Sequence, residues 1–172
     1  MPKGLKQTSS PIAVSARLVE SAANTYTEEE IDLTLTALDN EVFVVTQINI
    51  DVDAPDSVTA TTTGVSACIS TTSRATMGTI ADNNVLGSAA KLIVCNAGMT
   101  ADGGIPFDRE DPLFAALDQD YLGIVATSNM HLSIQGINNG SAKVVAARVY
   151  GYRAQADASV YAALVQSEVL SA

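Results

Sequence analysis

The chain has 172 residues, a formal net charge of −10 and a charged fraction of only 16%. This length suits one domain, which can bury a core without disulfide or metal support. The acidic balance, with only 9 lysines and arginines against 19 carboxylates, argues against a dedicated nucleic-acid binder, because phosphate contacts need lysine and arginine. No stretch has the apolar length of a membrane span. The charged fraction lies below the roughly 25% of an average soluble domain. It leaves room for extensive subunit contacts, although a surface rich in threonine, serine and asparagine explains it equally well.

The N-terminal segment combines chain breakers with short apolar runs. Pro2 and Pro11 interrupt regular structure, and Ile12–Val14 offers an apolar contact. We therefore predict an arm over residues 1–25, which wraps its own domain or a neighbour, and a single β-sandwich domain with a C-terminal helix over residues 26–172. The charge that opens the chain is not followed by an apolar run of signal-peptide length. We therefore expect synthesis in the cytoplasm, with no signal peptide.

Residues 26–38 and 41–53 alternate between apolar and polar side chains at nearly every step. Successive side chains of a strand point to opposite faces, so the pattern indicates two strands, and Asp39–Asn40 between them favours a hairpin turn. The apolar set is predicted to line the core together with two residues of a later strand: Ile31, Leu33, Leu35, Ile48, Ile50, Val52, Leu132 and Ile134. The polar set is predicted to face outward: Asp32, Thr34, Thr36, Asn49 and Asp51.

The middle of the chain is less regular. Residues 58–70 are rich in β-branched threonine and predict one long strand with a bend or bulge at Gly64. A short helix is predicted near 112–118, because Asp111 can cap it and Pro112 would occupy its first position, where a missing N–H costs nothing.

The C-terminal third predicts strands over 121–127, 130–135 and 143–153, and then a helix near 158–168. Asp157 can cap this helix, whose apolar stripe is Val160, Tyr161, Leu164 and Val165. About eight strands with short loops and little helix indicate an all-β fold. We predict an antiparallel two-sheet sandwich with jelly-roll-like connections.

Residues that could carry out catalysis are few. His131 is the only histidine, and in an alternating strand it shares a face with Ser133 and Gln135, which predicts that it faces solvent or an interface. Cys68 and Cys95 show no metal or redox spacing and no nearby base, so we expect buried free thiols. We predict no enzymatic activity, no catalytic or cofactor-binding residues and a dispensable His131.

Two carboxylate clusters are the best candidates for a bound cation. One is Asp51, Asp53 and Asp56 at the end of a strand, and the other is Asp108, Glu110 and Asp111 in a predicted loop. Oxygen-rich loops can hold Ca²⁺, but neither cluster has EF-hand spacing, which favours solvated acidic loops. A carboxylate pair for glycoside hydrolysis is a further alternative, disfavoured because aromatic platforms for a sugar are missing.

One strand of the C-terminal third carries an aromatic and basic patch, which consists of Arg148, Tyr150, Tyr152 and Arg153. Such a patch can stack single-stranded nucleic acid. The net charge of −10 favours instead a strand face that a neighbouring subunit or the C-terminal helix covers.

In its order of elements the chain resembles the single jelly-roll capsid proteins of tailless icosahedral viruses of archaea and bacteria. The resemblance rests on the arm, the eight or so strands, the segments 130–135 and 143–153 on either side of an Asn-Asn-Gly turn, the short last helix and the missing catalytic set. It implies barrels that pack side by side into a shell, a virion location and self-association, possibly with other capsid proteins. From the acidic charge and the missing catalytic set, we expect no specific nucleic acid and no small-molecule substrate.

Other functions remain open from the sequence. One is a non-catalytic binding module for a carbohydrate or a protein, and another is a decoration or filament subunit. A cupin-type enzyme is disfavoured because it needs several histidines for its metal.

Overall fold

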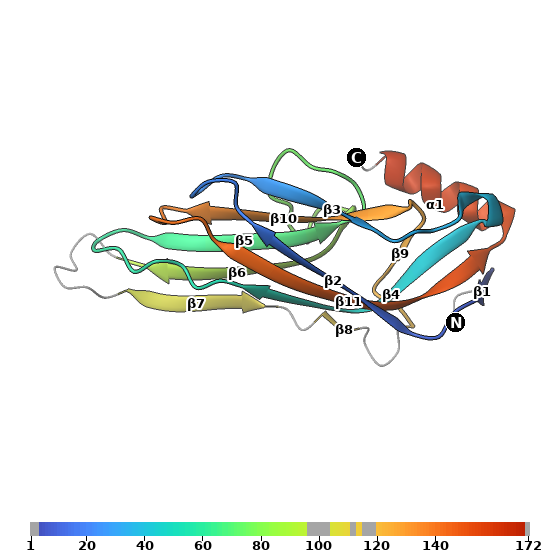
Figure 1. Cartoon of the computed structure of the whole chain (residues 1–172), viewed down its shortest axis with the longest axis horizontal. Coiled ribbons are helices and arrows are strands. Elements are labelled where there is room, and N and C mark those ends of the chain that lie inside the picture. Colours follow the sequence, from blue (N-terminus) through green and yellow to red (C-terminus); the bar gives the residue numbers. More distant parts are fainter. Residues whose placement is uncertain (1–3, 96–103, 111–112, 115–119, 171–172) are drawn as a thin grey trace.

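The computed structural model describes residues 4–95, 104–110, 113–114 and 120–170. Two antiparallel sheets face each other, and one helix lies at an end of the molecule (Figure 1). Sheet A contains β1 (Leu5–Gln7), β2 (Ile12–Val19), β4 (Glu41–Val52), β8 (Leu113–Phe114), β9 (Gly123–Val125) and β11 (Val144–Ala156). Sheet B contains β3 (Thr27–Asp32), β5 (Thr63–Ser70), β6 (Val85–Val94), β7 (Ile105–Glu110) and β10 (Asn129–Ile137).

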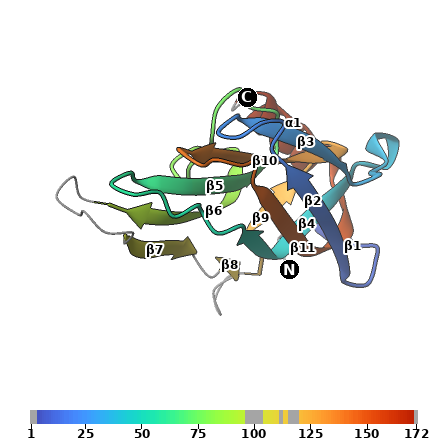
Figure 2. The same cartoon turned by 60° about the vertical axis from the view of Figure 1, so that its left-hand side comes forward.

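The strand order is that of a jelly roll. In sheet A, β1 and β2 follow each other along one side of β11, and β8 and β9 lie along the far side of β4. Sheet B has the order β3-β10-β5-β6-β7. The chain changes sheet after β2, β3, β4, β7, β9 and β10, as the views in Figures 1 and 2 let the reader follow. This winding confirms the predicted all-β sandwich with jelly-roll connections.

The core between the sheets contains the residues that alternation assigned to it. Seven of the eight predicted core side chains are buried: Ile31, Leu33, Ile48, Ile50, Val52, Leu132 and Ile134. Leu35 is partly buried and packs against the same cluster. The five side chains predicted to face outward are all exposed. The period-two pattern therefore assigned both faces correctly.

A bulge in β4 changes which residues face the core. Val45 pairs with Gly151 and Gln47 pairs with Tyr150, so Thr46 is the extra residue. The core residues of β4 are consequently Phe43 and Val45 before the bulge, and those at 48, 50 and 52 after it. A Cβ on Gly151 would collide with the Val44 carbonyl and lie 2.7 Å from the Phe43 ring, so glycine is required at this position.

Helix α1 (Ala158–Leu170) confirms the helix predicted near 158–168. It packs on the outer face of sheet A over a second apolar cluster that includes Val42, Val44 and Ala154. The predicted stripe faces this cluster, since Val160, Tyr161, Leu164 and Val165 all contact it. No helix in the described part of the chain is long and apolar enough to cross a membrane.

The predicted hairpin at Asp39–Asn40 is wrong. β3 belongs to sheet B and β4 to sheet A, and the short 3₁₀ helix η1 (Ala37–Asp39) connects them. Asn40 adopts a left-handed conformation, φ 51°, which turns the chain into the other sheet. β10 and β11, on either side of the Asn-Asn-Gly turn, likewise lie in opposite sheets. Alternation fits either connection, because it reports only which face is buried.

The segment predicted to be an arm lies along its own domain. β1 and β2 both pair with β11, and Leu5 and Leu18 are buried. Both strands of this segment are thus part of sheet A of their own domain.

Two further elements differ from expectation. The strand predicted over 58–70 begins only at Thr63, after a turn in which Val58 bridges Thr61. In the predicted helix near 112–118, Leu113–Phe114 are a short strand on β4, and residues 112 and 115–118 lie outside the described part of the chain.

Candidate functional site

The outer face of sheet B carries a polar cluster centred on Glu28 of β3. One carboxylate oxygen accepts the Ser73 hydroxyl at 2.6 Å, and the other accepts the Tyr26 hydroxyl at 2.8 Å and the Arg74 backbone N–H at 2.9 Å. His131 Nδ1 lies 3.3 Å from the same carboxylate. Ser73 and Arg74 belong to the β5–β6 loop, residues 71–84, so Glu28 fastens this loop over the sheet.

The environment of Glu28 changes two pKa values in opposite directions. Burial raises the pKa of the Glu28 carboxyl, but hydrogen bonds from Ser73, Arg74 and Tyr26 outweigh burial and lower it overall. Burial and the neighbouring Glu28 carboxylate both raise the pKa of the Tyr26 phenol. Glu28 therefore accepts as a carboxylate while Tyr26 donates as a neutral phenol.

Potential nucleophiles lie beside this cluster. Cys68 Sγ and Ser133 Oγ are 3.0 Å apart and buried, and Met77 of the 71–84 loop lies over Ser133. His131 makes its polar contact with Glu28, and not with either nucleophile. A base must reach the proton of the group that it activates, and His131 is placed against Glu28, so the contacts of this arrangement hold the loop.

The prediction that His131 faces solvent or an interface is corrected in one respect. His131 lies on the outer face of sheet B as alternation indicated, but the 71–84 loop covers it and leaves its side chain only 11% exposed. Nothing in the pattern of residues 71–84 predicts that this loop folds back over the sheet.

Contacts within the 71–84 loop keep it in place. Arg74 forms an ion pair with Asp82 at 3.2 Å and donates to Asn84 at 2.6 Å, and Asn84 donates to Thr72 at 2.6 Å. The backbone N–H of Thr79 and the charge of Arg74 lower the pKa of Asp82.

The carboxylates of the first predicted cluster, Asp51, Asp53 and Asp56, each contact a different donor. Asp56 pairs with Lys143 at 2.5 Å and accepts the Gly140 N–H at 2.8 Å, so its pKa falls. Asp51 lies 3.6 Å from Lys91, and Asp53 accepts the backbone N–H of residue 144. These carboxylates fasten the ends of the sheets and do not converge on one point.

The second cluster also departs from expectation. Asp108 and Glu110 lie in β7 and not in a loop, and Asp111 lies outside the described residues. Within the described part of the chain, no three His, Cys, Asp or Glu side chains come together to hold a metal ion. Cys68 is a buried free thiol as predicted, whereas Cys95 is only partly buried.

Sequence reasoning missed two buried carboxylates that act as fasteners. Glu20 follows β2 and accepts the N–H groups of Gly136 at 2.5 Å and Lys143 at 2.9 Å. Glu168 of α1 accepts the N–H groups of Ala126 and Thr127 at 2.9 and 3.1 Å. Burial raises the pKa of Glu168, although these donors oppose it. Its position one turn after Leu164 in the apolar stripe was the available signal.

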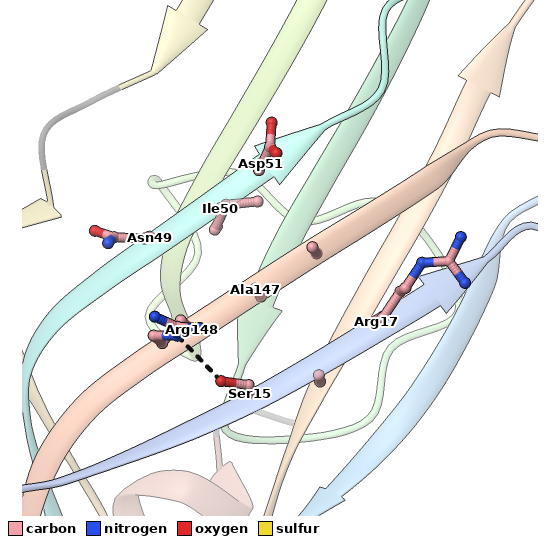
Figure 3. Close-up of a pocket in the computed structure, with 9 residues that line it drawn as sticks. Ser15, Arg17, Asn49, Ile50, Asp51, Ala147 and Arg148 are labelled. Atoms are coloured by element: carbon pink, nitrogen blue, oxygen red, sulfur yellow. Dashed lines mark hydrogen bonds between the residues drawn. The ribbon is translucent and has the colours of Figure 1, made fainter.

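The outer face of sheet A holds an open groove of about 510 Å³ (Figure 3). The small side chain of Ala146 lines the groove without filling it. The longer side chains that line it are Arg17, Arg148, Asn49 and Asp51. Arg148 Nε donates to Ser15 Oγ at 3.2 Å. Such a groove can hold a polar or anionic chain.

The predicted aromatic and basic patch is divided by the fold. Arg148 lines the groove, and Tyr152 packs toward α1. Arg153 turns to the other face of β11, where it donates to the Leu33 carbonyl and the Thr34 hydroxyl. The four side chains therefore form no single binding surface.

No family model matches the chain, and no curated protein sequence matches it. A solved structure of Desmodium yellow mottle tymovirus is similar with a TM-score of 0.31 and 10% sequence identity, over 92% of this chain and 96% of that chain. So low a score carries no functional argument. A function for this chain therefore has to be argued from the contacts within its own structure.

Proposed function

We propose that the chain is a structural subunit of a homo-oligomeric protein shell, such as a virus capsid. The observation that carries this proposal is the exposure of large apolar side chains at two separate ends of a packed sandwich. The half of the molecule that holds α1 presents Leu38 of η1, 95% exposed, near the start of the helix, and Leu170, 77% exposed, at its last residue. The other end presents Ile105 and Phe107 of β7. The tips of β5–β7 and helix α1 lie at opposite ends of the long axis (Figure 1).

Two separate apolar surfaces are more typical of a subunit in a lattice than of a protein that binds a single ligand. A shell subunit must contact more than one neighbour, whereas a binding module needs one surface for its ligand. The low charged fraction of 16% supports the same role, because few ionic groups must lose water when such surfaces meet.

The use of the polar groups is also consistent with a structural role. Glu28, Asp56 and Glu168 each accept hydrogen bonds that fasten a loop or the helix. These groups contribute to a rigid subunit and are not free to react. A shell subunit with this architecture needs no catalytic turnover.

The test is the oligomeric state of the purified full chain. Sedimentation velocity and negative-stain images over a range of concentrations should reveal assemblies of many copies. The chain carries −10, so assembly should increase with salt, which screens repulsion between copies. A protein that stays monomeric at high concentration and high salt would contradict the proposal.

The groove on sheet A favours a second candidate function, a non-catalytic binding module. Its lining of Arg17, Arg148 and Asn49 offers donors to a carbohydrate or an acidic peptide. A glycan and peptide array would test this function. If the monomeric chain binds a ligand and the Arg148→Ala variant does not, the binding module is favoured over the shell subunit.

A further inference from the structure

An exposed apolar patch lies on the outer face of sheet B, at the end far from α1. In the strand register, Ile137 pairs with Gly64, Gly64 with Leu92, and Leu92 with Phe107, which gives one row across four strands. Val94 and Ile105 form the next pair. We name these five side chains the tip patch: Leu92, Val94, Ile105, Phe107 and Ile137.

The tip patch points away from the core. Core residues of β5 are Val65, Ala67 and Ile69, so Gly64 lies in the opposite phase, and its row shares the outer face with Ser133. Phe107 is 52% exposed and Ile137 is 47% exposed. Side chains this large in one cluster are typical of an interaction surface.

The outer-face row beside the tip patch carries no carboxylate. It consists of Gln135, Ser66, Ala90 and Arg109. The outward-facing carboxylates Glu28 and Glu30 lie on β3, four strand spacings or about 19 Å from Phe107 of β7. This distance exceeds the Debye length of about 8 Å at physiological salt. A second copy can therefore meet the β7 part of the tip patch with little repulsion from these two carboxylates.

The edge of β7 does not suit strand addition. Pro106 lies in the middle of this edge strand and has no N–H to donate to a neighbour. The contact surface is therefore the face formed by the tip patch and not the strand edge.

We infer that the tip patch docks against the tip patch of a second copy across a two-fold axis. An apolar patch matches itself, as an isologous contact requires, and a two-fold axis that runs parallel to the strands beside Phe107 places the two acidic β3 strands on opposite outer flanks. This inference rests on the proposed function and specifies one of its contacts.

The first experiment compares Phe107→Asp with Ile80→Asp. Ile80 is 67% exposed in the 71–84 loop and is the matched control. By analytical ultracentrifugation, Phe107→Asp should weaken two-fold association at least about tenfold, whereas Ile80→Asp should leave it unchanged. Circular dichroism reports whether each variant folds, and Ile105→Asp replaces Phe107→Asp if that variant does not.

The second experiment tests the symmetry. In a Cys95→Ser background, Phe107→Cys should form a covalent dimer under oxidising conditions, because the axis brings the two positions together, and Ile80→Cys should not. If Phe107→Asp disrupts assembly but Phe107→Cys does not form a covalent dimer, the two-fold contact is overturned. A Phe107→Asp protein that assembles normally would overturn the inference but leave the proposed function intact. A wild-type chain that stays monomeric would overturn both.

Discussion

The ammonium group of Lys143 lies 2.5 Å from the carboxylate of Asp56, across a loop junction at one end of the sandwich. The Lys143 side chain is only 8% exposed, whereas that of Asp56 is 35% exposed. The contact therefore neutralises a buried cation with a partner that remains partly in solvent.

Asp56→Asn should lower the free energy of unfolding by about 1–3 kcal/mol, because it leaves the Lys143 ammonium buried without its counter-charge. The pKa of Asp56 is below 3.8 in the folded chain, so its stabilisation is present above that value and is lost as pH falls through the lowered pKa. Urea unfolding at neutral pH measures the change. Asp51→Asn is the control, since Asp51 is 86% exposed, and an equal loss there would contradict the argument.

Glu28→Gln should release the 71–84 loop, because the amide cannot accept all the hydrogen bonds that Ser73, Arg74 and Tyr26 donate. Amide hydrogen exchange should speed up in residues 71–84 while the core strands stay protected. Glu29→Gln is the matched control, since Glu29 is exposed. Because the pKa of Glu28 is lowered from 4.5, the tether should hold above that pH and weaken as pH falls through the lowered value. Equal exchange in the two variants would show that Glu28 does not hold the loop.

Glu168 should have the opposite pH dependence. Its pKa is raised above 4.5 by burial, so its contribution to stability is fully present below 4.5 and is lost as pH rises through the raised pKa. Glu168→Gln should flatten this part of the stability profile. Glu168→Ala should cost about 1–3 kcal/mol, because it leaves the N–H groups of Ala126 and Thr127 without an acceptor. Urea unfolding across this pH range measures both variants. If the pH profile of stability in Glu168→Gln equals that of the unmodified chain, Glu168 is not the group responsible for the pH dependence.

Ile50→Ala should lower the free energy of unfolding by about 2–5 kcal/mol, because it opens a cavity between the sheets. Ile50 is buried in the main core, and its exposed neighbour Asn49 supplies the control variant Asn49→Ala. Thermal and urea unfolding of both variants give the difference. A cost below about 0.5 kcal/mol for Ile50→Ala would be incompatible with its packing.

Alternation predicted faces but not partners. Ile31, Leu33, Ile48 and Ile50 could be assigned to the core because burial on one face imposes a period of two. The same pattern cannot distinguish a hairpin from a crossing between sheets. The difference depends on η1 and on the left-handed conformation of Asn40, which are local features without a periodic signal.

The polar cluster was harder to predict for a related reason. Three glutamates follow one another at 28–30, and their side chains are chemically identical. Only the register of β3 on β10 places Glu28 opposite Ser133, where the 71–84 loop can reach it. That register depends on long-range packing, so the sequence could predict an acidic strand but not which carboxylate holds the loop.

The position of the last two strands has a consequence for how the chain reaches its native state. β11 lies between β2 and β4, and β10 lies between β3 and β5, so the final strands occupy the interior of both sheets. During synthesis, β2 and β3 leave the ribosome about a hundred residues or more before their partners. The edges of β2 and β3 are therefore unpaired until β10 and β11 have been synthesised. The two sheets form through contacts between residues distant in sequence. Such contacts form slowly, which leaves time for aggregation. We expect refolding on a timescale of milliseconds to seconds, and a nascent chain that lacks residues 129–156 to require a chaperone.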